Sequence, residues 1–119
     1  MNSKRKGKAG ELELAHKLTE YGFECRRTQQ FCGKGGESAD VIGLPYIHIE
    51  CKRVEKLNID EALQQATKDS KTENIPAVFH RRNGTPWKVT LSLDDFMKVY
   101  NEYFSSMKLK EMERKNEKK

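Results

Sequence analysis

The stretch ESADVIGLPYIHIECKR, residues 37–53, decides the fold, because it holds two apolar runs separated by a turn. We predict a β-hairpin with strands over 41–42 and 46–52 around the turn GLPY. Alternate residues of a strand point to opposite faces. The second strand therefore presents one apolar set to a core and one polar set to the other face: Ile47, Ile49 and Cys51 against Tyr46, His48, Glu50 and Lys52.

The position of Asp40 relative to this strand depends on the length of the hairpin loop. With a three-residue loop, Leu44–Tyr46, Asp40 pairs opposite Glu50 and shares its face. With a two-residue loop it pairs with Ile49 and points the other way. A shared carboxylate site therefore requires the odd-length loop, a bulge or a diagonal contact.

Two carboxylates on one face predict a metal site. Held together, they repel each other by several kcal/mol at low dielectric unless a cation neutralises them. Oxygen ligands favour Mg²⁺, with Mn²⁺ as a substitute, and the backbone carbonyl of Cys51 offers a further ligand beside Asp40 and Glu50. Lys52 points to the same place, where an ammonium can orient a metal-bound water, favour loss of its proton, or stabilise negative charge on a phosphate.

The remaining chain predicts a mixed α/β domain with a central sheet flanked by helices, in the order α-β-β-β-α-β-β-α. Helices are expected over 10–21, from Asn58, and from Ser92 to about 107, with further strands over 23–28, 77–80 and 87–91. Residues 1–8, MNSKRKGK, are expected as a flexible basic arm, 9–107 as one domain, and 108–119 as a charged tail that continues the last helix and frays.

The first helix places Glu11 within its apolar stripe. Counting 100° per residue, Leu14, Ala15 and Leu18 fall on the same side, whereas Glu13 falls on the opposite side and should face water. Glu11 is therefore expected to reach the acidic site, through a water molecule.

Composition narrows the class of partner. The formal net charge of +5 makes a polyanion plausible. No apolar run approaches the ~18–20 residues that span a membrane, and no signal peptide is recognisable, so we expect action without a membrane, in the cytoplasm of a cell or of a phage-infected host. Three cysteines with no Cys-x₂-Cys pair favour reduced thiols over a zinc site.

The pattern Asp40-x₉-Glu50-Cys51-Lys52 resembles the PD-(D/E)xK nuclease superfamily, although Ala39 stands where the superfamily name has proline. Within it, KGKAGELELAHKLTEYGFECRRT (6–28) and GGESADVIGLPYIHIECKR (35–53) resemble archaeal-type Holliday junction resolvases.

This resemblance implies a restriction-endonuclease-like fold and a Mg²⁺-dependent endonuclease that acts on branched DNA as a homodimer. It implies catalytic roles for Glu11, Asp40, Glu50 and Lys52, and a metal held by Asp40, Glu50 and the Cys51 carbonyl with help from Glu11. The residues expected to bind DNA are Lys4, Arg5, Lys6, Lys8, Arg27, Lys34 and Arg53.

Other interpretations stay open. Glu50 and Lys52 also suit a solvated pair on an exposed sheet face, and Glu11 also suits a first-turn acid that favours the helix dipole. His48 is expected at DNA or solvent. Rival functions are another nuclease of this superfamily, for restriction, repair or fork cleavage, and a catalytically silent DNA-binding module.

Overall fold

The computed structural model describes residues 3–28 and 39–117 and confirms the expected α/β class and order of elements. The elements are α1 (Ser3–Thr19), β1 (Arg26–Arg27), β2 (Val41–Ile42), β3 (Ile47–Arg53), α2 (Ile59–Asp69), β4 (Ile75–Arg81), β5 (Lys88–Thr90) and α3 (Leu93–Glu117). The five strands form one mixed sheet in the order β1-β2-β3-β4-β5, with β3 and β4 parallel and the other neighbours antiparallel.

The β2–β3 hairpin adopts the odd-length loop. Val41 pairs with Ile49, so the register continues to Gly43 opposite Ile47 and leaves Leu44–Tyr46 as the loop. Tyr46 takes a left-handed backbone conformation at φ 68°, as the last residue of a three-residue hairpin loop commonly does. The loop therefore turns Asp40 toward the face of Glu50.

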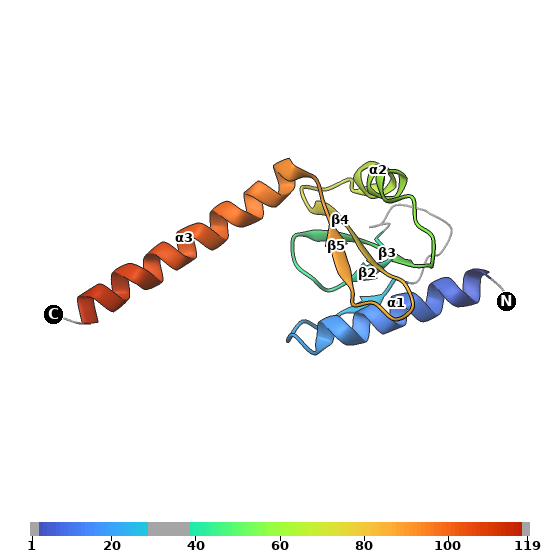
Figure 1. Cartoon of the computed structure of the whole chain (residues 1–119), viewed down its shortest axis with the longest axis horizontal. Coiled ribbons are helices and arrows are strands. Elements are labelled where there is room, and N and C mark those ends of the chain that lie inside the picture. Colours follow the sequence, from blue (N-terminus) through green and yellow to red (C-terminus); the bar gives the residue numbers. More distant parts are fainter. Residues whose placement is uncertain (1–2, 29–38, 118–119) are drawn as a thin grey trace.

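The two faces of the sheet are covered by different helices (Figure 1). On one face, Ile49 and Phe79 pack with Leu14 and Ala15 of α1, and Ile47 and Cys51 adjoin this core. On the other face, Val78 packs with Ala62 and Ala66 of α2. Glu50 pairs with Val78 in the β3–β4 register, so the acidic side chains lie on the α2 side of the sheet.

Helix α1 lies close to β3 because Gly10 has no side chain. A Cβ added there would lie 2.5 Å from Cβ of Arg53. The helix begins at Ser3, so Ser3–Lys8 belong to α1 where an unstructured arm was expected. It ends at Thr19, and Gly22 follows with φ 97° in the left-handed region.

The expected capping of α2 is present, because the side chain of Asn58 accepts a hydrogen bond from the backbone N–H of Glu61 at 3.1 Å. The third helix continues to Glu117, so residues 108–117 extend it as a charged helical tail. It differs from expectation in its direction, because it runs away from the sheet (Figure 1). Within Leu93–Glu117, all of which is described, no residue is buried. In the described part of the chain, no helix is long and apolar enough to cross a membrane.

The sequence predicts that the aromatic side chains Tyr21, Phe23, Phe79, Trp87, Phe96 and Tyr100 lie in the core, but several of them are outside it. Phe79 is buried and Trp87 packs against the α1 core, as expected. Four others are substantially exposed, namely Tyr21, Phe23, Phe96 and Tyr100. Phe96 and Tyr100 belong to α3, so for these two residues the error follows from a helix that projects from the domain.

Candidate active site

Asp40 is fixed at the start of β2 by three hydrogen bonds. Its N–H donates to the Ile49 carbonyl at 2.9 Å, and its carbonyl accepts from Thr28 N–H at 3.0 Å. Its carboxylate Oδ2 accepts from the backbone N–H of Cys51 at 2.8 Å. The carboxylate thus takes the place of a main-chain carbonyl as the acceptor for a donor of β3, which brings it next to Glu50.

Asp40 and Glu50 are close enough to share a hydrogen bond between their side chains. Glu50 is only 6% exposed. Burial, followed by the negative charge of Asp40, raises the pKa of Glu50 to about 7, against the opposing effect of Lys52. Burial likewise raises the pKa of Asp40, although the Cys51 N–H and the charge of Lys52 lower it in part. The pair therefore holds negative charge at a cost that a cation would relieve.

Lys52 is the basic member of the site. Its Nζ lies 3.7 Å from Glu50 Oε1, and more than a third of its side chain is exposed. It lines a hollow of about 370 Å³ between the end of β3 and the first turns of α2, which Gln65 also lines. The amine is thus open to an incoming ligand on one side and held by Glu50 on the other.

The donor set fits a hard divalent cation with few protein ligands. Among the described residues, no group of three or more His, Cys, Asp and Glu side chains is spaced to hold a metal. Mg²⁺ commonly uses only one or two carboxylates and keeps several waters. The Cys51 N–H points to Asp40, and in a strand the N–H and C=O of one residue point to the same side. The Cys51 carbonyl therefore points to the same side of β3 as its N–H, where it would offer a third oxygen to such a cation.

Glu11 approaches this corner from α1 and is paired with arginine. Its Oε2 lies 3.4 Å from Nε of Arg27, and both side chains are largely buried. Burial, followed by the charge of Asp40, raises the pKa of Glu11, whereas Arg27 lowers it. Glu11 is therefore within electrostatic reach of Asp40, and its direct partner is Arg27.

The residues expected to bind DNA do not form one surface. Arg27 is occupied by Glu11, and Arg53 donates to Glu13 at 3.3 Å and to Asn83 at 2.9 Å on the α1 side of the sheet. Lys8 is exposed on α1. Lys34 lies outside the described residues, as do the side chains of Lys4, Arg5 and Lys6.

Three features were not predicted from the sequence. His48 is fully buried, so the expected contact with DNA or solvent is wrong. Glu13 does not simply face water, because it accepts from both Arg53 and Arg81. A basic pocket lies at the β4–β5 turn, lined by His80, Arg82 and Lys88. The signal for this pocket was the run HRRNGTPWK, residues 80–88, which crosses a turn between two strands.

Comparison with known proteins gives a family for the whole chain. The model of the family described as "Phage putative PDDEXK endonuclease" matches residues 2–119, which include α3. Neither the curated proteins nor the solved structures contain a match to the chain.

Proposed function

This chain belongs to the family described as "Phage putative PDDEXK endonuclease", and from that premise we propose that it is a divalent-metal-dependent endodeoxyribonuclease that cuts four-way (Holliday) junctions. The observation that carries the proposal is the meeting of Asp40, Glu50 and Lys52 at one corner of the sheet. One buried and one half-buried acid beside an amine suit hydrolysis of a phosphodiester, because one cation and one ammonium together oppose the charge of the phosphate.

Each residue has a distinct role in this proposal. Asp40, Glu50 and the Cys51 carbonyl hold Mg²⁺ or Mn²⁺, which when bound polarises the phosphate and acidifies water. Lys52 orients the attacking water and donates to the charge that develops on the phosphate. Glu11 is held by its ion pair with Arg27, and its charge tunes the field at Asp40. Cleavage leaves a 5′-phosphate and a 3′-hydroxyl.

The preference for branched DNA rests on the resemblance of residues 6–28 and 35–53 to archaeal-type junction resolvases. The alternative is a PDDEXK nuclease with another DNA substrate, such as a fork or a linear duplex. A phage enzyme of either kind acts in the cytoplasm of the host. A silent DNA-binding module is disfavoured by the raised pKa values at Asp40 and Glu50, since plain DNA binding gives no reason to bury two adjacent acids.

A homodimer is part of the proposal, because symmetrical cuts in a four-way junction need two active sites. Helix α3 supports it. Its exposed apolar side chains Leu93, Phe96, Tyr100, Tyr103 and Met107 recur at alternating spacings of three and four, the repeat of paired helices. Tyr100 packs only on neighbours of its own helix, among them Phe96 and Phe104, within the described contacts.

The charges of α3 favour a second copy in antiparallel alignment. Its first part, 93–107, holds three acids and one lysine, whereas 108–117 holds four basic and three acidic residues. An antiparallel pair brings the acidic part of each helix toward the basic part of the other. A parallel pair would bring like charges together.

The function is tested with a labelled four-way junction and a linear duplex of the same sequence, each with and without Mg²⁺. We expect Mg²⁺-dependent cleavage of the junction in preference to the duplex. Equal cleavage of both overturns the junction preference and favours another nuclease of the family. No cleavage of any branched or linear DNA in Mg²⁺ or Mn²⁺ overturns the enzyme.

The dimer is tested in the full chain with Tyr100→Glu against the matched control Asn101→Glu, which adds the same charge on a polar face of α3. Sedimentation should give the mass of two chains for the wild type and the control, and of one chain for Tyr100→Glu. Unchanged mass in Tyr100→Glu excludes α3 as the interface.

A further inference from the structure

A row of side chains crosses three strands on the face that holds the acidic pair. Lys52 of β3 pairs with His80 of β4, and His80 pairs with Lys88 of β5. Directly paired residues of neighbouring strands point to the same face. The row therefore begins at the amine of the candidate active site and ends on the edge strand.

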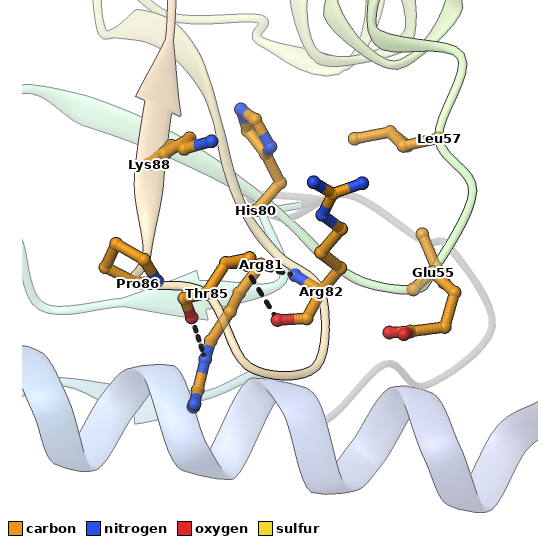
Figure 2. Close-up of a pocket in the computed structure, with 9 residues that line it drawn as sticks. Glu55, Leu57, His80, Arg81, Arg82, Thr85, Pro86 and Lys88 are labelled. Atoms are coloured by element: carbon orange, nitrogen blue, oxygen red, sulfur yellow. Dashed lines mark hydrogen bonds between the residues drawn. The ribbon is translucent and has the colours of Figure 1, made fainter.

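The far end of this row opens into a pocket of about 200 Å³ at the β4–β5 turn. Figure 2 shows the amine of Lys88 and the guanidinium of Arg82 on either side of the His80 ring. His80 Nε2 lies 2.9 Å from Thr90 Oγ1. Burial, followed by the charge of Lys88, lowers the pKa of His80, so the positive charge here comes from Lys88 and Arg82.

These two cations differ from the neighbouring arginines in how they are paired. Arg81 donates to Glu13 and to the Thr85 carbonyl, and Arg53 is held by Glu13 and Asn83. For Arg82 and Lys88, no ion pair exists among the residues that the structure describes. Two cations left without carboxylates around one pocket suit an anion from outside.

The one acid that lines the pocket is already engaged. Glu55 accepts a hydrogen bond from the backbone N–H of Asn83 at 2.8 Å and lies 3.9 Å from Arg53. Its carboxylate is thus held by groups at the rim. It does not neutralise Arg82 or Lys88.

The pocket is next to the hollow that contains Lys52. Both are lined by Val54 and Leu57, so these two side chains form the wall between them. Adjacent strands lie ≈ 4.8 Å apart, which puts Lys88 roughly 10 Å from Lys52 across two strand spacings. One DNA strand advances about 3.4 Å along the axis for each phosphate. A separation of this size keeps both phosphates on one stretch of backbone, within a few nucleotides of each other.

We propose that the pocket formed by Arg82, Lys88 and His80 binds a backbone phosphate of the DNA, a few nucleotides from the phosphate held at Lys52. The proposal rests on the proposed function, since it assigns the register of the DNA relative to the cut. In this proposal the β4–β5 turn is a positioning element that aligns the DNA strand without touching the reacting atoms.

The test measures DNA binding in EDTA, where no cleavage occurs, for Arg82→Ala/Lys88→Ala against the matched double variant Lys17→Ala/Lys71→Ala. The control pair is exposed and lines neither hollow. The contacts of Arg82 with Thr85 use its backbone N–H and carbonyl, so removing its side chain leaves the turn intact. The probes are a labelled four-way junction and a linear duplex, titrated at several salt concentrations.

We expect the pocket variant to lose roughly tenfold in affinity and about two units in the slope of log K against log salt. Its residual cleavage in Mg²⁺ should also scatter over neighbouring positions. The pocket is overturned if the control variant loses as much affinity as the pocket variant, or if the pocket variant keeps the wild-type salt slope. It is also overturned if the wild type binds no DNA. If the wild type cuts nothing while the pocket variant still loses affinity, the enzyme fails and the pocket stands.

Discussion

Two charged regions lie on one face of the same sheet and differ in their exposure to water. The acidic pair Asp40 and Glu50 is largely buried, and burial is the main cause of its raised pKa values. The basic pair Arg82 and Lys88 is exposed at a turn. A buried charge raises the free energy of the folded protein until a counter-charge binds beside it. An exposed charge costs little free energy, and the strength of its interactions depends on the salt concentration. The first arrangement suits chemistry and the second suits binding.

The largest expected effect separates chemistry from binding. Glu50→Gln keeps the shape of the side chain and removes its charge, so the proposed metal site loses one of its two carboxylates. We expect cleavage of DNA to fall by about 1,000-fold, since a bound metal contributes several kcal/mol to such reactions. Affinity for DNA in EDTA should stay the same or rise. Single-turnover kinetics measure the cleavage rate, and binding titrations in EDTA measure the affinity for DNA.

The control for this variant is Glu73→Gln, which removes an exposed carboxylate from the loop before β4. It should cut at the wild-type rate. Cleavage by Glu50→Gln within tenfold of wild type would remove Glu50 from the chemistry.

The next effect concerns stability and pH. The folded protein retains a proton on Glu50 up to about pH 7, whereas the unfolded chain releases it near 4.5. Between these values the unfolded chain binds fewer protons, so the free energy of unfolding falls as pH rises, by at most about 3 kcal/mol. Glu50→Gln should flatten this slope and unfold less readily than wild type at pH 8. Urea titrations in EDTA from pH 5 to 8 measure both, and parallel curves for the two proteins would contradict the assignment.

A smaller expected effect is the stabilisation of the folded protein by a cation at the acidic pair, which is measured without DNA cleavage. A ligand present at ten times its dissociation constant stabilises the folded state by about 1.4 kcal/mol. Mg²⁺ at pH 8 should therefore raise the unfolding temperature of the wild type. It should raise that of Asp40→Asn and Glu50→Gln much less. Equal stabilisation of all three would place the ion elsewhere.

The sequence was sufficient for the features that depend on local periodicity. The alternation of residues 46–52 predicted which side chains of β3 enter the core, and the structure confirms the core side of Ile47, Ile49 and Cys51. The turn GLPY left the loop length open, because two-residue and three-residue loops are both common. The positive φ of Tyr46 belongs to the longer loop, which is what turns Asp40 toward Glu50.

Features that depend on contacts between distant elements could not be predicted in this way. The helical pattern assigned Glu13 to water, but Gly10 allows α1 so close to β3 that Glu13 meets Arg53 and Arg81. The aromatic residues of α3 have the composition of a core, and nothing local indicates that the helix leaves the domain. The basic pocket likewise needs the pairing of β3, β4 and β5 before Lys52 and Lys88 lie in one row.

The smallest expected effect compares Glu11 and Glu13, two carboxylates of α1 with different partners. Glu13 joins Arg53 to Arg81, and about a third of its side chain is exposed, so Glu13→Gln should lower the free energy of unfolding by about 1 kcal/mol and leave cleavage within twofold. Glu11 is more deeply placed beside Asp40, and Glu11→Gln should slow cleavage by about tenfold with a smaller change in stability. Urea unfolding and cleavage rates of the two variants, measured side by side, distinguish these roles. If Glu13→Gln slows cleavage as much as Glu11→Gln does, the two acids act together, and the separation between a structural and a catalytic side of α1 is wrong.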